Sequence, residues 1–581
     1  MSSTVVYNNF VSPTFWRNRF RRTVFEIWDA NLHHGDVRPF ACPTEVCASG
    51  TLRKLYYQPE CPCHGFSDDR DIVQGFCDLQ HFHILNGRLH QATTTELCAG
   101  HSGCLAGAPF LNGRPNAGGS CGSCDGTAVS YVVTFVTEHA GIQVEGAPSK
   151  PSFPVTSGGD VPGVGVSWGA APPGHCVVAT RLYRVVSSFE DGTTEVPFVG
   201  SEFVFVREFQ GGGGGLFADN VPTADTGGPL VTYDPMAFPA PDHLIGVART
   251  TDGIAVADSN RVYVSVAGQP QFTFDGVVEV EDTIRAIRAI GNQIFVFTDN
   301  RPVKVGYQLK DGAMALDRQV LNRHLPLLSK RSLSIFSNSI YFSSTHSLYR
   351  WDTGVYGKDL NAALTSLVTP EQWLNIDPDS IVGTAYELGY IFSSDEIDFS
   401  LMVEFERSGT DTVNGTSMMP ISYIASPNAF STDHDGHIIY QENNAVYRWD
   451  WRRRVCSTFQ PHDHVRPVAC EQCECCPWQL KLYYDNEGKN HFSHMRVEWD
   501  ERSADGLDVS FHAFEFGREV DISETMKIIS SRGFGIPTNR GYQTPYANLI
   551  GCAIMHEVRF ATSAQELVST SNRLLQTEEG G

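Results

Sequence analysis

The sequence predicts a mainly β protein, with β-propeller-like repeats after a fibronectin type III-like sandwich and with Cys-rich, loop-rich segments at both ends. Three observations support this fold class. Short apolar runs alternate with turn residues between residues 244 and 451, and one phrase occurs twice there, at Leu348–Asp352 and at Val446–Asp450. The composition includes 53 Gly, 31 Pro and 35 Phe, and few stretches have helical periodicity. Many turns and few helices are typical of β proteins.

A chain of 581 residues is too long for one hydrophobic core, and its length predicts about three to five domains. Shifts in composition suggest where the boundaries lie. We expect a Cys/His-rich segment at 1–125, the sandwich at 126–210, a Gly-rich linker at 211–235, propeller hairpins at 236–455, a β-rich segment with a Cys cluster at 456–562, and a polar tail at 563–581.

The N-terminal segment shows little periodicity. Its one amphipathic stretch runs from Phe15 to Trp28 and carries the arginines Arg17, Arg19, Arg21 and Arg22. Arg-rich segments of this kind are usually solvated surface rather than partner contacts, and we expect a solvated surface here.

The sandwich is predicted from short β runs separated by Gly and Pro turns, at 129–136, 164–168 and 179–184. Five consecutive glycines follow, Gly211 to Gly215. They have high backbone entropy and no side chains to pack, so we expect a flexible loop. A phosphate-binding loop is disfavoured because no Lys-Ser/Thr pair follows the glycines.

Five hairpins are predicted between residues 236 and 455 from alternating apolar residues and the turn residues between them. They span 253–265, 284–298, 333–351, 381–392 and 437–449, with turns at 258–260, 291–292, 338, 388–389 and 443–444. Repeats of about 40 to 50 residues with two to four strands each indicate a propeller. In the two repeated phrases, Trp351 and Trp449 are predicted to pack between strands rather than to stack on a ligand.

The formal net charge is −23, with a pI near 5.3. A surface of this charge argues against tight DNA binding, although acidic walls would let DNA slide past without sticking. The N-terminal residues lack the apolar core of a signal peptide, and no run approaches 18 apolar residues. We therefore expect neither export nor membrane insertion.

Sixteen cysteines are the main alternative source of a functional site. The N-terminal set is Cys42, Cys47, Cys61, Cys63, Cys77, Cys98, Cys104, Cys121 and Cys124; the C-terminal set is Cys456, Cys470, Cys473, Cys475 and Cys476, with His462 and His464 upstream, while Cys176 and Cys552 stand apart. Two C-x-x-C pairs have zinc-knuckle spacing, but neither has a second pair at the standard distance. Disulfides, free structural thiols and a structural metal all remain open, and a catalytic thiol is disfavoured.

Two acidic clusters resemble chemical sites. The run from Asp433 to His437 offers metal-ligand or acid/base groups, but its Asp-Gly pair between two strand halves favours a hairpin turn. Glu396 and Asp398 are two residues apart, as a carboxylate pair on one strand face would be, yet no third group converges on them and we expect a solvated loop or strand edge. No zinc-protease, Walker or dinucleotide motif is present.

The order of several motifs resembles the tail nozzle and tail tubular structural proteins of short-tailed bacteriophages. The resemblance covers roughly residues 128 to 450. Its motifs lie at 130–136, 146–149, 181–184, 244–247, 253–254, 260–265, 294–299, 329–332, 371–373, 378–381 and 386–392. The Gly211–Gly215 run and the Cys/His-rich ends depart from the family pattern.

The resemblance implies a virion tail protein, made in the host cytoplasm, that forms a homo-oligomeric ring of six subunits around the DNA ejection channel. It implies contacts with an adaptor or head-to-tail connector and with tail fibre or tailspike proteins, and passage of genome DNA without specific binding. We assign no catalytic, cofactor-binding or metal residues. An alternative is a tail-associated glycan-binding or hydrolytic propeller, suggested by nine Trp and 20 Tyr. A third interpretation is a cytosolic scaffold protein whose loop-rich segments are held together by a structural metal.

Overall fold

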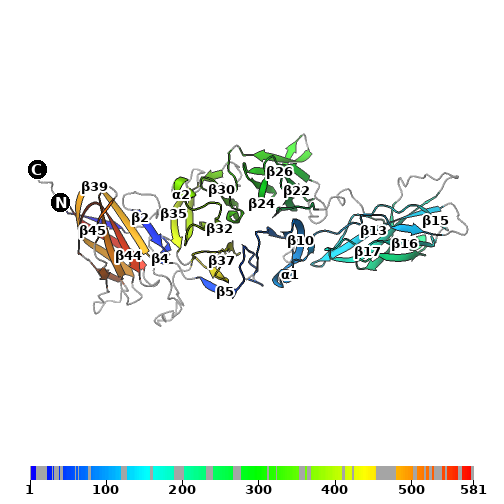
Figure 1. Cartoon of the computed structure of the whole chain (residues 1–581), viewed down its shortest axis with the longest axis horizontal. Coiled ribbons are helices and arrows are strands. Elements are labelled where there is room, and N and C mark those ends of the chain that lie inside the picture. Colours follow the sequence, from blue (N-terminus) through cyan, green and yellow to red (C-terminus); the bar gives the residue numbers. More distant parts are fainter. Residues whose placement is uncertain are drawn as a thin grey trace. The chain divides into compact units, whose positions relative to one another are not determined.

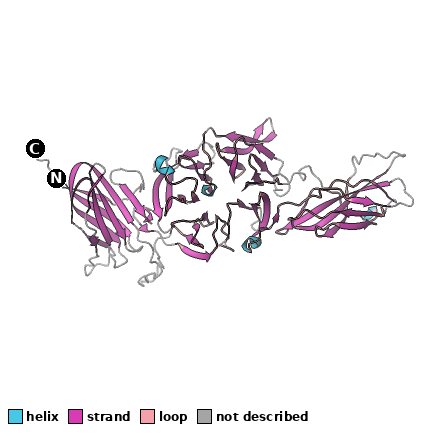
Figure 2. Cartoon of the chain, in the orientation of Figure 1, coloured by secondary structure: helices cyan, strands magenta, loops and turns pink. Residues whose placement is uncertain are grey.

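A computed structural model describes most of residues 43–452, with gaps at 59, 63, 76–79, 120–126, 158–160, 189–201, 231–239, 266–275, 311–312, 322, 353–359, 363–367, 369, 408–412 and 422–423. Outside this span it describes the backbone of 2–7, 23–28, 30–31, 38–39, 479–500, 507–515, 518–522, 526–528, 540–543, 546–560 and 566–576. The chain divides into two compact units, the first formed by Met1–Asp69 with Leu327–Gly581 and the second by Arg70–Pro326. Strands dominate both units, as predicted (Figure 2).

Three sheets of the first unit have four antiparallel strands each, in the part of the chain that is described. Two of them run in sequence order, while the third takes its last strand from near the N-terminus. Their strands are β28 (Ser334–Phe336), β29 (Ser339–Ser343), β30 (Leu348–Asp352) and β31 (Leu360–Ala362); β32 (Val382–Tyr386), β33 (Gly389–Ser393), β34 (Ser400–Arg407) and β35 (Val413–Ile421); and β36 (Ala429–Thr432), β37 (Ile438–Glu442), β38 (Ala445–Trp449) and β5 (Thr44–Ala48).

The second unit contains three further four-stranded antiparallel sheets among its described residues. Each is a simple meander. Their strands are β8 (Ile72–Gln74), β9 (Gln80–Leu85), β10 (Arg88–Thr93) and β11 (Cys104–Leu105); β20 (Gly246–Arg249), β21 (Ile254–Ala257), β22 (Arg261–Val264) and β23 (Gly276–Glu279); and β24 (Ile284–Ile290), β25 (Gln293–Thr298), β26 (Val303–Lys310) and β27 (Ala313–Val320).

Within each unit the first strands of successive sheets lie next to one another. In the first unit β32 contacts both β28 and β36, and in the second β20 contacts both β8 and β24. Apolar side chains fill the space between neighbouring sheets. One core contains Tyr341, Tyr390 and Leu401 of the first unit, and another contains Val264, Ile287 and Val296 of the second. Sheets that face each other through their first strands are the packing unit of propeller blades.

The repeated phrase forms the third strand of two sheets, β30 and β38. Its tyrosine stacks on the aromatic residue directly opposite on the second strand: Tyr349 on Phe342 at 5.7 Å between ring centroids, and Tyr447 on Tyr440 at 5.1 Å. Its tryptophans are buried, with 4 % of Trp351 and none of Trp449 exposed. The prediction that both tryptophans pack between strands is confirmed.

Turn residues account for the predicted hairpins, all five of which are present. Asn443 and Asn444, with φ of 49° and 61°, join β37 to β38 in the left-handed conformation that a two-residue hairpin turn requires. Gly291, with φ of 60°, serves the same purpose between β24 and β25. In the fourth hairpin the turn is at 387–388, one residue earlier than predicted, because Gly389 already pairs as the first residue of β33.

Two further sheets of the second unit, one of three strands and one of five, form the β-sandwich (Figure 1). One consists of β12 (Asn116–Gly118), β16 (Val164–Trp168) and β19 (Gly215–Asp219); the other consists of β13 (Thr127–His139), β14 (Ile142–Glu145), β15 (Val155–Ser157), β17 (Val177–Ser188) and β18 (Val204–Gln210). Their core includes Tyr131, Phe135, Val166 and Trp168. The two-sheet architecture agrees with the predicted sandwich.

The five-glycine run lies in the crossover between β18 and β19 rather than between domains. Gly211 has φ of 79°, and Gly215 is the first residue of β19. A Cβ at Gly212 would approach Val177 to 2.8 Å, and a Cβ at Gly215 would overlap the Trp168 ring. These glycines therefore allow close packing inside the sandwich, in a region where we expected a flexible linker.

A nine-stranded sheet of the first unit joins both ends of the chain. Its strands are β1 (Ser2–Tyr7), β2 (Thr23–Trp28), β39 (Gln479–Asp500), β40 (Leu507–Glu515), β41 (Arg518–Ile522), β42 (Met526–Ile528), β43 (Arg540–Gln543), β44 (Tyr546–Phe560) and β45 (Glu566–Gln576). β45 pairs with β39 and with β1. The span that we expected to be a polar tail thus contributes a strand.

The remaining described elements are short. They are the strand pairs β3 (Ala30–Asn31) with β4 (Arg38–Pro39) and β6 (Lys54–Leu55) with β7 (Gly65–Phe66), the helices α1 (Thr94–Cys98) and α2 (Pro370–Leu374), and the 3₁₀ turns η2 (Thr223–Asp225) and η4 (Lys330–Ser332). None of the described helices has the length and apolar character needed to cross a membrane.

Candidate functional site

The acidic run at Asp433 forms the predicted hairpin turn, between β36 and β37. The Asp433 amide donates to the His437 carbonyl at 3.0 Å, and the Gly436 amide donates to the Asp433 carbonyl at 3.1 Å. The Asp433 carboxylate accepts hydrogen bonds from the amides of Asp435 and His437, at 3.0 and 2.8 Å. Its side chain is fully buried. Asp433 therefore holds the backbone of the turn.

The same turn brings three potential metal ligands together. One ligand atom each from Asp433, Asp435 and His437 lie within 4.8 Å of one another, the one such group among the described residues. Arg448 of β38 already lies against these carboxylates. It donates to Asp433 Oδ2 through Nε and to Asp435 Oδ2 through Nη2, at 3.0 Å each. The guanidinium supplies the positive charge that a cation would otherwise bring.

The electrostatics of this cluster favour ionised Asp433. Burial would raise the pKa of the carboxyl, but the backbone and imidazole hydrogen bonds from His437 and the positive charge of Arg448 together hold that pKa below its ordinary value. The imidazole Nδ1 of His437 lies 3.0 Å from Asp433 Oδ2. A carboxylate held ionised by hydrogen bonds from His437 and by Arg448 stabilises the turn and is a poor general acid.

The second acidic candidate is an exposed turn. Glu396 and Asp398 lie between β33 and β34, and both are exposed. Because neither residue is on a strand, the face-sharing geometry considered for a glycosidase pair does not arise. The expected solvated loop is what the structure has at this position.

The Ser329–Ser332 motif connects neighbouring sheets of the first unit. Ser329 Oγ donates to the Ile381 carbonyl at 2.6 Å, and Ser332 Oγ accepts from the Ser343 amide at 2.9 Å. Tyr390 Oη also donates to the Ser332 carbonyl. The hydroxyls of this motif therefore satisfy buried backbone groups at the turn η4.

The five cysteines whose side chains are described are in disulfides. Cys104 of β11 is bonded to Cys176, which directly precedes β17, and Cys47, Cys61 and Cys98 are disulfide-bonded as well. For these five residues the disulfide alternative holds over free thiols and a metal site. Both C-x-x-C pairs, the whole C-terminal Cys/His cluster and the four arginines at 17–22 lie outside the described residues.

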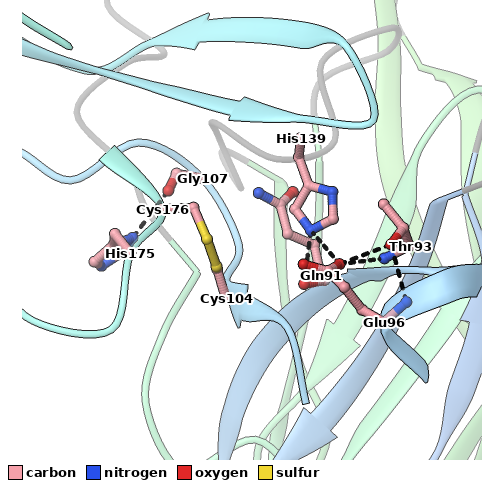
Figure 3. Close-up of a disulfide and its surroundings, with 8 residues drawn as sticks. All are labelled: Gln91, Thr93, Glu96, Cys104, Gly107, His139, His175 and Cys176. Atoms are coloured by element: carbon pink, nitrogen blue, oxygen red, sulfur yellow. Dashed lines mark hydrogen bonds and ion pairs between the residues drawn. A yellow bond between two sulfur atoms is a disulfide. The ribbon is translucent and has the colours of Figure 1, made fainter. Parts of the chain in front are cut away.

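The Cys104–Cys176 bond joins the β8–β11 sheet to the sandwich (Figure 3). Beside it, Leu105 donates its amide to the Gly174 carbonyl at 2.9 Å, and His175 Nδ1 donates to the Gly107 carbonyl at 2.9 Å. The disulfide and these two hydrogen bonds all lie where the chain leaves β11 and where it enters β17. They form one side of what we call the sheet–sandwich junction.

His139, the last residue of β13, forms the other side of the junction (Figure 3). Its Nε2 donates to the Gln91 carbonyl of β10 at 3.0 Å and lies 3.6 Å from Glu96 Oε2. Glu96 is fixed by a capping box with Thr93 at the start of α1. The sandwich is thus tied to the sheet through β13 and β17, its two longest strands.

Further imidazoles lie close to the junction. His83 and His90 face each other across β9 and β10, with their rings stacked at 5.6 Å between centroids. Burial lowers the pKa of His90, and the positive charges of Arg70, Arg88 and His175 lower it further. Burial also lowers the pKa of His175. Both imidazoles therefore favour the neutral form.

A buried ionic group lies in the core of the sandwich. Arg184 Nη1 and Tyr131 Oη each donate to Asp219 Oδ2 at 2.8 Å, and none of the three residues is exposed. Arg184 Nη1 also donates to the Val221 carbonyl at 2.8 Å. This group fixes the end of β19 against β13 and β17. The sequence offered no sign of it, because its members are 35 and 88 positions apart.

Comparisons with known proteins provide no family for this chain. No family model matches the sequence, and no curated protein does. Among solved structures, the AfRom2 CNH domain shares 13 % identity with a TM-score of 0.23 over 50 % of this chain and 90 % of that one. An exo-beta-1,3-galactanase from Phanerochaete chrysosporium shares 9 % identity with a TM-score of 0.20 over 56 % of this chain and 95 % of that one.

Glutaminyl cyclase from Myxococcus xanthus shares 7 % identity with a TM-score of 0.19, over 36 % of this chain and 91 % of that one. At such identities and scores, these likenesses carry no argument about function. The class of this protein follows from its own fold: a mainly β chain of two units, with propeller-like sheets and a β-sandwich.

Proposed function

We propose that this chain is a structural subunit of a short bacteriophage tail, of the nozzle or tubular type. In this proposal it assembles into an oligomeric ring that continues the DNA ejection channel, and its neighbours are an adaptor or connector and tail fibre or tailspike proteins. The starting point is the order of motifs between residues 128 and 450. Blade-like sheets and a sandwich are suited to presenting complementary patches around a closed ring.

The observation that supports a structural role most strongly is the burial of the tryptophans. Trp168, Trp351, Trp373, Trp449 and Trp451 are each at most 7 % exposed. They are all the tryptophans whose side chains are described. Aromatic faces that stack on sugars must be open to solvent, so these five side chains favour internal packing over glycan recognition.

The polar groups support the same role. Arg448 neutralises Asp433 and Asp435 from within the fold, and the hydroxyls of the Ser329–Ser332 motif bind backbone atoms. Groups that already have internal partners stabilise a fold rather than act on a substrate. The net charge of −23 agrees with a channel protein that DNA passes without sticking.

The direct test is electron microscopy of the purified chain and of its parent particle. The proposal predicts rings of the purified chain, or a ring of this chain within the particle. A chain that stays monomeric at all concentrations and is absent from particles would overturn it.

A second assay distinguishes the glycan alternative. We expect no saccharide binding on a glycan array and no retention of DNA in low salt, where a basic protein of similar size would bind with a Kd of about 10⁻⁶ M or tighter. Specific binding of one oligosaccharide class would instead favour the glycan-binding propeller.

A further inference from the structure

We propose that the Cys104–Cys176 bond is a thiol–disulfide switch that sets how firmly the sandwich is fastened to the β8–β11 sheet. When oxidised it clamps the sheet–sandwich junction, and when reduced it leaves only hydrogen bonds there. The inference concerns the second unit alone and does not depend on the proposed tail function. It begins with the position of the bond in the chain.

The bond closes a loop that contains most of the sandwich. Its two cysteines are separated by 72 positions, and β12 to β16 all lie between them. Cys104 belongs to the edge strand β11, which pairs with β10 over only two residues. An edge strand this short contributes few backbone hydrogen bonds, so the covalent bond is the strongest tie on this side of the junction.

The backbone at the bond is shaped for close approach. Gly174 has φ of 92°, and a Cβ there would come within 3.0 Å of Leu105 Cδ1. Gly103 has φ of 65°, and a Cβ there would overlap the Gln91 carbonyl oxygen. Glycines at both positions let the segments containing Cys104 and Cys176 lie side by side, with their Cα atoms 5.7 Å apart.

The bond is also accessible to a reductant. Cys104 and Cys176 are both half-buried, and each lies two residues after an exposed residue, Ser102 and Gly174 respectively. A small or protein dithiol supplies the two electrons. One of its thiolates attacks a sulfur of the pair, the S–S bond breaks, and the other cysteine leaves as a thiolate and takes up a proton. The second thiol of the reductant then resolves the mixed disulfide, leaving two cysteine thiols and the oxidised reductant.

The reduced junction retains a weaker tie through His139. Its hydrogen bond to the Gln91 carbonyl comes from β13, on the other side of the junction, and His139 itself is only 6 % exposed. Reduction therefore loosens the β11–β17 side first, while the sandwich core, which is built from β13, β16 and β17, stays intact. Local opening, rather than unfolding, is the expected response.

Hydrogen exchange on the full chain tests this inference. In the oxidised wild type we expect slow exchange at 104–107 and 174–177. In the double variant Cys104→Ser/Cys176→Ser, exchange in these two segments should rise about tenfold or more, while residues 131–135 of β13 stay protected. Reductant added to the double variant should change these segments no further, which separates this bond from the other disulfides. Equal exchange in the oxidised wild type and the double variant would overturn the switch.

A titration with a dithiol redox buffer keeps the test decisive if the double variant fails to fold. The fraction of bonded Cys104–Cys176 peptide, measured by mass spectrometry, should fall together with protection at 104–107. Reduction of the bond with unchanged exchange, or resistance of the bond until β13 loses protection, would each contradict the proposal.

A matched pair of variants measures the remaining tie. His139→Leu removes the hydrogen bond to Gln91, whereas His139→Gln keeps a donor at this position. In the oxidised chain both should resemble the wild type at the junction, and in the reduced chain only His139→Leu should exchange faster still. An equal effect of His139→Leu in both redox states would show that the two ties are not coupled, against the proposal.

Discussion

At the scale of single residues, the acidic turn of the first unit has its charged partner within the fold. That partner is Arg448: it occupies the third position of the repeated phrase in β38, and the turn Asp433–His437 is built around its guanidinium. The sequence predicted the turn from its Asp-Gly pair. It did not predict the partner, because Arg448 lies 15 residues further on and is brought back by the β37–β38 hairpin.

Removing Arg448 should therefore destabilise the first unit. Arg448→Met leaves the buried Asp433 carboxylate without its arginine partner, and we expect the free energy of unfolding to fall by about 1–3 kcal/mol. A fully buried ion pair would cost more, but Arg448 is partly exposed to solvent. Urea unfolding followed by tryptophan fluorescence measures it, since Trp451 donates to the Gly436 carbonyl of the same turn. Arg261→Gln, which breaks an exposed pair with Glu279, is the control and should leave the midpoint unchanged. Equal midpoints for Arg448→Met and the wild type would refute this account of the turn.

The buried imidazoles predict how stability depends on pH. Burial, with Arg70, Arg88 and His175 nearby, holds the pKa of His90 below its ordinary 6.5, against a hydrogen bond with the Ser102 backbone that raises it. The folded chain therefore binds fewer protons than the unfolded chain once the pH drops below 6.5. The contribution of neutral His90 to the free energy of unfolding is fully present above pH 6.5 and is lost as the pH falls toward the lowered pKa.

Thermal unfolding of the second unit between about pH 7.5 and pH 5.5 checks this direction. The midpoint should decrease on acidification, and His90→Gln should make the decrease shallower. A variant that is as sensitive to acid as the wild type would show that other groups carry the effect.

At the scale of elements, the hairpins were the most predictable part of the fold. Alternating apolar residues and turn residues act within about 20 residues, and both can be read directly from the sequence. The pairing of β5 with β38 and of β45 with β1 could not be read in this way, because those partners are hundreds of residues apart. The same limit applies to Cys104 and Cys176, since spacing alone does not define disulfide connectivity.

Close approach between strands β33 and β34 yields a second stability prediction. A Cβ at Gly389 would fall on the carbonyl oxygen of Val403, which is backbone and cannot move aside without breaking the sheet. We expect Gly389→Ala to cost more than about 2 kcal/mol. At Gly50, after β5 in the same unit, a Cβ meets nothing within 4 Å, so Gly50→Ala is the matched control.

Chemical denaturation of the two alanine variants, compared side by side, settles the point. Similar midpoints for Gly389→Ala and Gly50→Ala would mean that the β33–β34 pairing tolerates a side chain at this position.

At the scale of the whole molecule, the sequence predicted a mainly β chain with blade-like repeats and a sandwich, and the structure has both. It predicted the ends less well. The described strands within residues 1–125 are shared among the nine-stranded sheet, two blade-like sheets, the sandwich and two small strand pairs. In the nine-stranded sheet, the β36–β38 sheet with β5, and the sandwich, they pair with strands from far along the chain. Local composition does not predict such long-range strand pairings.

The junction also bears on assembly. A chain made in a reducing cytoplasm keeps Cys104 and Cys176 as thiols, and oxidising surroundings close the bond. Under the proposed tail function, the sandwich would then be held loosely during assembly and fastened in the mature particle. Mass spectrometry of the Cys104–Cys176 peptide from freshly made chains and from particles compares the two states.

The central proposal is that the chain builds a ring around the tail axis. Electron microscopy of the parent particle, with an antibody or tag on this chain, tests it most directly. The proposal predicts a closed ring of several copies around the tail axis. Particles in which the label is absent, together with a purified chain that remains monomeric, would contradict it.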